Sequence, residues 1–258
     1  MSNKPVSECG VAILGGSAGV GLETAARFAE QGARVAILGR SPERGASACD
    51  IVRTRVSGAE ISFFQVDATD SADTVRAEAA VRAKLGMIDV LVCTTGPSQP
   101  PRLLKNIPIS DVALRLNEII LPPLHMMHAV LPAMREQKNG AIINVASDAA
   151  KVATPGETLI GAAMAAIVMF SKAAALEHKR EGIRINLLTP SLIANTPGAA
   201  LIGNDPFAAK MFEKAAAMAH LGVAESEDLA LMALYLASPA ARRITGQAIS
   251  INGGISVG

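Results

Sequence analysis

The stretch VAILGGSAGVG, residues 11–21, gives the first indication of the fold of this chain. Its first four residues predict a buried strand, and its glycines open a predicted helix over about 20–31. Gly15, Gly19 and Gly21 are spaced for a tight turn that lets a pyrophosphate approach the backbone at a helix N-terminus. A glycine-rich turn without a ligand needs the same residues, so the triplet alone is weak evidence.

Apolar runs alternate with helical patterns along the rest of the chain. Further strands are expected at 34–38, 61–66, 89–95, 141–146, 184–189 and 247–251, and helices at 43–57, 72–85, 111–136, 157–181, 205–219 and 226–236. Strands that are apolar throughout and alternate with helices are typical of a parallel sheet covered on both faces. We predict a single doubly wound, Rossmann-like α/β domain over residues 1–258. The stretch 195–204 predicts a mobile loop at a ligand-binding edge.

The composition disfavours several classes of function. The 24 Lys and Arg residues nearly balance the 23 Asp and Glu residues, and Trp is absent, so we expect no nucleic-acid partner. The longest apolar run, 162–170, is shorter than the ~20 residues of a membrane span, and the polar start has no signal-peptide core. The three cysteines, without CxxC spacing, indicate reduced thiols and a cytoplasmic protein.

Several motifs together resemble the short-chain dehydrogenase/reductase family over nearly the whole chain. VAILGGSAGVG is similar to that family's cofactor turn, VDATD to its adenine-side segment, and GMIDVLVCTTG and AIINVAS to its fourth and fifth strands. Two later segments are also similar to motifs of that family, SKAAALEHKREGIRINLLTP and ITGQAISINGG. The resemblance implies hydride transfer with NAD or NADP. It implies cofactor contacts at Gly15, Ser17, Gly19, Gly21, Arg40, Asp67 and Gly96.

The catalytic residues that the resemblance implies are only half present. In the family a Tyr phenol exchanges a proton with the substrate, and a Lys four residues later lowers the pKa of that phenol from its usual ~10. A Ser orients the substrate and an Asn completes a proton relay. Asn117 and Ser147 match the last two. Ile160 and Met164 stand at the Tyr and Lys positions, and counting back from GIRIN gives the same register.

Neither Ile160 nor Met164 can exchange a proton, and Tyr235 lies in a later packing helix. Other family positions also differ, at Leu14, at 93–95, at Ser191 and at Asn195. Because Met keeps the volume of Lys without its charge, the two losses are consistent with each other. We therefore expect no tightly bound dinucleotide, and the matching site residues are interpreted as vestigial. Any residual binding should favour NADP, since Arg40 stands where NAD enzymes place an acid.

Other constellations are weaker. His125 and His128 share a predicted helix face, but no acidic third ligand is near in sequence, so packing is preferred to a metal site. Asp148, Lys151 and Glu157 could supply a replacement acid or base, although surface loop residues explain them better. No His lies near Ser147 in sequence, which argues against a hydrolase triad. His178 and His220 are expected to be isolated and solvated.

Three functions remain open. The first is a catalytically degenerate subunit in a hetero-oligomer, expected to be a heterotetramer, whose active partner of the same family oxidises a hydroxyacyl-CoA-type alcohol with NAD. The apolar helix around GAAMAAIVMFSKAAA would pack against that partner. The second is altered chemistry, as a lyase, isomerase or slow NADP-linked reductase, through Asn117, Ser147 and Glu157. The third is a nucleotide or acyl-CoA sensor.

Overall fold

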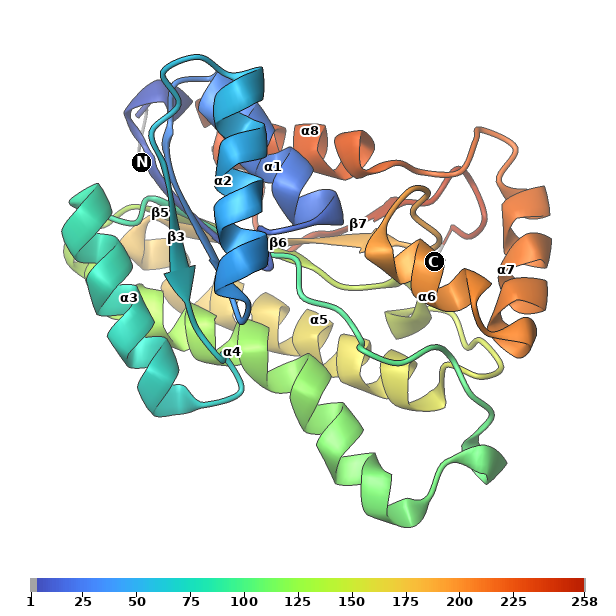
Figure 1. The fold of residues 1–258 in the computed structure, drawn as a ribbon. Coiled ribbons are helices and arrows are strands. Elements are labelled where there is room, and N and C mark those ends of the chain that lie inside the picture. The colour runs from blue at the N-terminus through green and yellow to red at the C-terminus, as the bar shows by residue number, and fades with distance from the viewer. Residues whose placement is uncertain (1–3, 258) are drawn as a thin grey trace.

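The computed structural model describes residues 4–257 and places seven parallel strands in one sheet (Figure 1). The strand order is β3-β2-β1-β4-β5-β6-β7. The strands are β1 (Gly10–Leu14), β2 (Arg34–Gly39), β3 (Ile61–Gln65), β4 (Val90–Cys93), β5 (Gly140–Val145), β6 (Ile183–Pro190) and β7 (Ala248–Ile251). The order reverses between β1 and β4, and in such folds ligands bind at the carboxyl ends of the strands beside that reversal.

Helices cover both faces of the sheet, as the sequence predicted. Figure 1 shows α1 (Gly19–Glu30), α2 (Pro42–Arg55) and α8 (Ser226–Ala237) above the sheet, and α3 (Ser71–Leu85), α4 (Val112–Glu136) and α5 (Thr158–His178) below it. The short helix α6 (Pro197–Gly203) and the longer α7 (Pro206–Met218) lie beyond the carboxyl ends of the strands.

Two apolar layers explain why the strands read as continuous hydrophobic runs. All five residues of β1 are buried, because alternate side chains enter opposite layers. Val11 and Ile13 pack with Phe28 of α1 in the upper layer, while Ala12 and Leu14 pack in the lower one. The doubly wound α/β prediction is confirmed.

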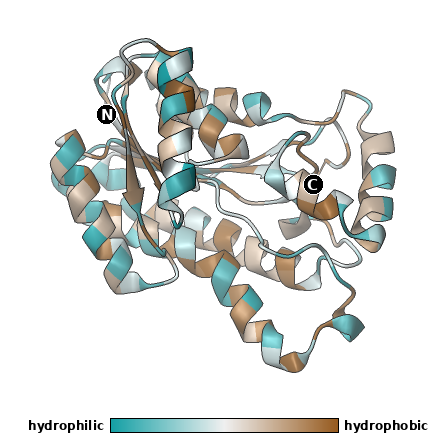
Figure 2. Ribbon diagram, in the orientation of Figure 1, coloured by the Kyte–Doolittle hydropathy of each residue, from teal (hydrophilic) through white to brown (hydrophobic). Residues whose placement is uncertain are grey.

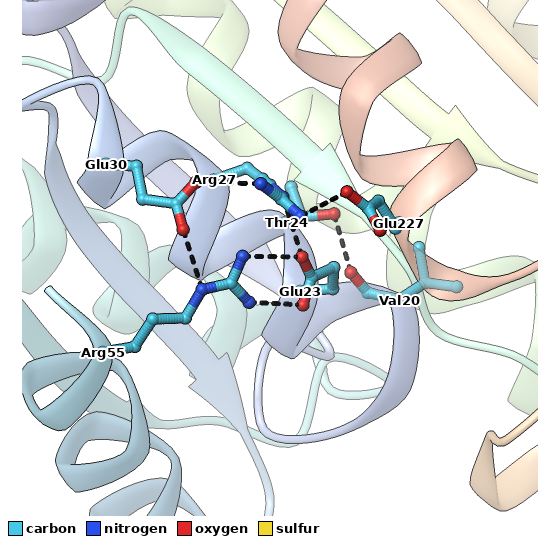
Figure 3. A network of polar contacts seen from close by, with 7 residues as sticks. All are labelled: Val20, Glu23, Thr24, Arg27, Glu30, Arg55 and Glu227. Atoms are coloured by element: carbon cyan, nitrogen blue, oxygen red, sulfur yellow. Dashed lines mark hydrogen bonds and ion pairs between the residues drawn. The ribbon is translucent and has the colours of Figure 1, made fainter.

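A polar network joins three helices of the upper layer (Figure 3). Arg27 of α1 lies between Glu23 and Glu30 of its own helix and reaches Glu227 of α8. Arg55, at the end of α2, holds both oxygens of Glu23 at 2.7 and 3.0 Å. This paired hydrogen bonding lowers the pKa of Glu23. The network fixes α1, whose N-terminus forms the glycine turn.

One predicted segment is wrong. The stretch 195–204, expected as a mobile loop, contains helix α6. Thr196 caps it by accepting a hydrogen bond from the Ala199 backbone at 3.1 Å, and Pro197 occupies its first turn. These two start signals outweigh the glycines of the segment, and α6 comes to lie at the ligand edge of the sheet.

Helix α5 is apolar but only partly covered by its own chain. The helical segment Thr158–Glu181 passes the length and hydropathy test for a membrane span, and 44% of its 18-residue apolar window is buried inside the protein. A core helix passes the same test, and α5 packs against α4 and β6. Figure 2 shows apolar turns along α4 and α5. Met169 and Leu176 of α5 are 66% and 65% exposed, so an apolar face remains unpartnered in the single chain.

Candidate functional site

The glycine turn has the tight geometry that its spacing predicts. Gly15 and Gly19 adopt φ values of +82° and +50°, which favour glycine. A side chain on Gly21 would collide with the Gly15 carbonyl and would stand 2.6 Å from Thr94 Oγ1. Thr94, which directly follows β4, donates its hydroxyl proton to the Leu14 carbonyl at 2.9 Å. The turn is therefore closely packed against the end of β4.

Helix α6 lies directly against this turn. A Cβ placed on Gly19 would stand 3.3 Å from Cδ of Pro197 and 3.5 Å from side-chain atoms of Thr196. Nothing in the spacing of the glycines signals this contact, because α6 follows β6, far along the chain. The space beside Gly19 is thus taken by the chain itself.

The adenine-side residues lie at the surface. Arg40 follows β2 and is exposed, as is Asp67 after β3. Thr69 lowers the pKa of Asp67 through hydrogen bonds from its hydroxyl and backbone, with a smaller contribution from Arg40. Ser17 is half-buried in the glycine turn, and Gly96 is exposed after β4. These positions border one edge of the sheet, as the resemblance implies.

Ile160 and Met164 belong to an apolar cluster at the start of α5. Met164 is 3% exposed and packs with Ile119 of α4, and Ile160 packs against the same cluster. The remaining buried members are Ala146, Ala163, Ile167, Val168 and Leu187. A hydrocarbon environment of this kind stabilises Met and would penalise an ammonium. In this chain, Ile160 and Met164 therefore lie in apolar surroundings.

Asn117 and Ser147 differ in their hydrogen bonds. The Asn117 side chain is exposed and makes no hydrogen bond to the part of the chain that the structure describes. Ser147 Oγ instead accepts a hydrogen bond from the Ala149 backbone at 3.1 Å and caps the 3-10 helix η4 (Asp148–Ala150). The structure does not join these two residues by any hydrogen bond.

A small cavity lies beside Ile160. Its volume is about 20 Å³, and Ile119, Leu159 and Arg115 are among its lining residues. One water needs roughly 10–15 Å³ by the same kind of measure, so the cavity has room for about one water. This one cavity is therefore too small to hold an organic substrate by itself.

Asp148 and Lys151, here called the Asp148 group, were interpreted from the sequence as surface loop residues. The structure corrects this for Asp148, which is buried. Asp148 is 6% exposed and accepts hydrogen bonds from Asn252, Ser250 and Ser256. Lys151 Nζ donates to Ser250 Oγ at 2.5 Å and lies 3.9 Å from Asp148 Oδ1. The loop after β5 is thereby tied to the C-terminal segment, whose part in the site the sequence did not signal.

Glu157, which directly precedes α5, has a raised pKa. Burial raises its pKa, and the nearby Asp148 charge raises it further, while a hydrogen bond with Thr154 acts in the opposite direction. It precedes α5 without capping it through its side chain. A carboxyl with a raised pKa is a candidate acid or base, although the adjacent cavity is small.

Two hydroxyls in this region lack partners. Thr95 Oγ1, after β4, and Thr189 Oγ1, on β6, are buried and make no hydrogen bond to the described residues. Thr189 pairs with Ser250 across the β6–β7 ladder, so it lies near the Asp148 group. The sequence indicated Thr95 only as a departure from the family pattern, and it did not indicate Thr189, because a Thr within an apolar strand carries no signal of its own.

The other candidates have structural partners. His125 Nδ1 lies 3.0 Å from the Ala68 carbonyl, and no metal-binding group of three side chains occurs within residues 4–257. His178, expected to be solvated, is instead paired with Glu181 at 2.6 Å. Tyr235 lies on α8, in the layer opposite α5, so it cannot act at Ile160.

Comparisons with known proteins agree with this architecture. A family model described as enoyl-(acyl carrier protein) reductase matches residues 15–256. The 3-oxoacyl-(acyl-carrier-protein) reductase FabG of Chlamydia trachomatis is 33% identical over 246 residues, which cover 95% of this chain and 96% of the relative. The 7alpha-hydroxysteroid dehydrogenase of Bacteroides fragilis is 31% identical, covering 96% and 94%.

Solved structures are similar over the same span. A short-chain type dehydrogenase/reductase from Mycobacterium ulcerans matches with a TM-score of 0.87 at 26% identity, covering 95% of this chain and 88% of that one. A variant of the actinorhodin polyketide ketoreductase with NADPH matches with a TM-score of 0.86 at 26% identity, covering 98% and 99%.

A parallel sheet whose strand order reverses beside a glycine turn defines a Rossmann-like α/β fold. Within that class, the chain belongs to the short-chain dehydrogenase/reductase family. The relatives with assigned names are reductases and dehydrogenases, so membership fixes the fold and the broad oxidoreductase class.

The residues present do not fit the family's dinucleotide at its reactive end. The buried Met164 offers no cation to a ribose, and α6 lies against Gly19. Arg40 and Asp67, at the adenine side, are present but exposed. At the reactive end, the start of α5 offers an apolar cluster and no polar pocket for the nicotinamide ribose. No catalytic step through NAD or NADP can therefore be derived from this chain alone.

Proposed function

We propose that the protein is a catalytically degenerate subunit that supports an active partner of the same family. The observation that carries this proposal is the apolar cluster at Ile160 and Met164, where the family has its Tyr and Lys. A positioned acid or base contributes ~10²–10⁴ in rate, so an ordinary reductase activity should be nearly absent.

The unpartnered face of α5 supports association with a second chain. Met169 and Leu176, seven residues apart on one face of α5, are exposed apolar residues, as is the adjacent Phe170. Contiguous exposed apolar surface marks interaction sites. The occupant that we propose is a family member that keeps the Tyr and Lys, in a heterotetramer.

The partner's reaction is inferred by resemblance. Within the family, the chain resembles the incomplete subunit of the heteromeric dehydrogenase that acts on 2-(hydroxy(phenyl)methyl)succinyl-CoA in anaerobic toluene degradation. By that resemblance the partner would oxidise a hydroxyacyl-CoA with NAD, and both subunits would lie in the cytoplasm. This chain would hold no dinucleotide of its own.

The test is recovery of the partner with a tagged copy of this chain expressed in its source cells. The wild-type chain should carry a second family member at equal stoichiometry. Met169→Glu with Leu176→Glu should release that partner, because two carboxylates would be buried in the interface. Val75→Glu, at an exposed apolar position on α3, is the matched control and should retain it.

Altered chemistry is the second candidate, favoured by the raised pKa of Glu157 beside the buried Asp148. It requires the site to open, since the cavity at Ile160 has room for about one water. Turnover of a carbonyl or hydroxyacyl compound by the purified chain, lost on Glu157→Gln and Ser147→Ala, would favour this candidate over the degenerate subunit.

A further inference from the structure

A second cavity lies at the opposite edge of the sheet, away from the glycine turn. Its volume is about 220 Å³. Val90, Gly140 and Ile183, which begin β4, β5 and β6, line its floor. This is the amino edge of the strands, so the cavity is separate from the site described above.

The walls of this cavity are strongly cationic. Lys4, Lys179, Arg184, Arg242 and Arg243 line it, against one acid, Asp89. The whole chain has a formal net charge of only +1, so the concentration of cations here departs from the balanced background. A concave surface of one charge sign attracts and concentrates small ions of the opposite sign.

Among these cations, Asp89 pairs only with Lys4. It lies 2.6 Å from Lys4 Nζ and also accepts from the Gly10 backbone at 2.9 Å. Lys179, Arg242 and Arg243 form no ion pair with the part of the chain that the structure describes.

Helix ends account for only part of this charge. The carboxyl ends of helices carry partial negative charge, and cations commonly lie there. Arg184 donates to the Leu236 and Ala237 carbonyls at the end of α8, at 2.6 and 3.2 Å. These bonds use two of its five N–H groups. Burial lowers the pKa of Arg184, which indicates that its charge is not fully compensated.

We propose that this cavity binds a small phosphorylated anion through Arg184, Arg242, Arg243 and Lys179. Guanidinium groups match the paired oxygens of a phosphate, and Lys adds a point charge. The cavity is smaller than the ~300–1,000 Å³ of sites for drug-sized ligands, which favours a phosphate or diphosphate group over a whole cofactor. The site does not depend on the degenerate-subunit function.

Calorimetric titration with inorganic pyrophosphate at fixed ionic strength tests the site. Saturable one-to-one binding is expected, with Kd at least tenfold weaker in the double variant Arg242→Gln, Arg243→Gln. The matched control is Arg180→Gln, an exposed arginine next to Lys179 that does not line the cavity, and its Kd should equal that of the wild type. Equal Kd values in all three proteins, or no saturation, would overturn the proposal.

A second measurement uses the unmodified protein, so it does not depend on the folding of a variant. Pyrophosphate should slow chemical acetylation of Lys179 severalfold while leaving Lys172, an exposed lysine of α5 outside the cavity, unchanged. Equal protection of both lysines would indicate general screening and would contradict a built site.

Discussion

The two edges of the sheet differ in what their polar groups contact. At the carboxyl edge, Asp148 and Lys151 are bonded to the chain's own C-terminal segment, and an apolar cluster surrounds Met164. At the amino edge, Lys179, Arg242 and Arg243 line an open cavity without acidic partners among residues 4–257. In this family the carboxyl edge is where cofactor and substrate bind. Here Asp148 and Lys151 at that edge are bonded within the chain, while the fold that supports the edge is intact.

This difference indicates that the residues that determine the fold are separate from the residues that carry the family's proton-transfer chemistry. The glycine turn persists because Thr94 and Gly15 pack against Gly21, which needs no bound nucleotide. The family's Tyr and Lys side chains serve proton transfer and do not pack to hold the turn together. In this chain those positions are Ile160 and Met164, which pack among apolar side chains.

The largest expected effect comes from reversing that change. Met164→Lys places an ammonium in the apolar cluster, and a Lys pKa depressed by 3–5 units in such a site corresponds to a loss of about 3–5 kcal/mol in unfolding free energy near pH 7. Urea denaturation measures it. Met164→Leu is the control and should cost less than about 1.5 kcal/mol. A Lys variant as stable as the Leu variant would mean that the carboxyl edge still holds a polar pocket.

Asp148→Asn should have the next largest effect. The amide keeps the shape but places an N–H₂ group among the donors Asn252, Ser250 and Ser256, so about 2–3 kcal/mol should be lost. Asp50→Asn, on the exposed side of α2, should change stability by less than about 0.5 kcal/mol. If thermal unfolding finds the two variants alike, Asp148 is not structural and becomes free for chemistry.

Gly21→Ala tests whether packing alone preserves the glycine turn. The new methyl group meets the Gly15 carbonyl and Thr94, so overpacking should destabilise the chain by about 1–2 kcal/mol in urea denaturation. Gly203→Ala is the matched control, because nothing lies within 4 Å of its Cβ position, and it should be neutral or stabilising. If Gly21→Ala instead matches the wild type in stability and differs only by losing stabilisation by NADPH, the turn serves cofactor binding.

The smallest effect is a pH dependence at Glu157. Its folded pKa is raised, so its contribution to stability is complete below the unfolded pKa and is lost as the pH rises through the folded pKa. Glu157→Gln should therefore raise Tm by about 1–3 °C at pH 7 and have no such benefit at pH 4. A lower Tm for the variant at pH 7 would show that the ionised carboxylate is stabilised where it lies.

Most of the fold could be predicted because it depends on local periodicity. Buried strands, capped helices and the glycine turn each leave a pattern within a few residues. The sequence also places Ile160 and Met164 at the family's Tyr and Lys positions, because the neighbouring motifs fix the alignment register. The sequence did not predict the helix at Pro197–Gly203, although Thr196 and Pro197 are ordinary helix start signals. The glycines of this short segment favour a loop.

The rest of the site depends on contacts between distant segments. The burial of Asp148 comes from Asn252 and Ser256, which belong to the C-terminal segment, and the closure over Gly19 comes from Pro197. The cationic cavity likewise joins Lys179 with Arg242 and Arg243 from separate elements. Spacing along the chain carries no information on such pairs until the topology is known.

The central claim, that this chain lost its chemistry and serves an active partner, is tested most directly by intact-mass measurement of the complex from source cells in the presence of NADH. We predict equal numbers of this chain and of a family member that keeps the Tyr and Lys, with NADH bound once per partner chain. A homo-oligomer of this chain, or one NADH for each of its copies, would contradict the account.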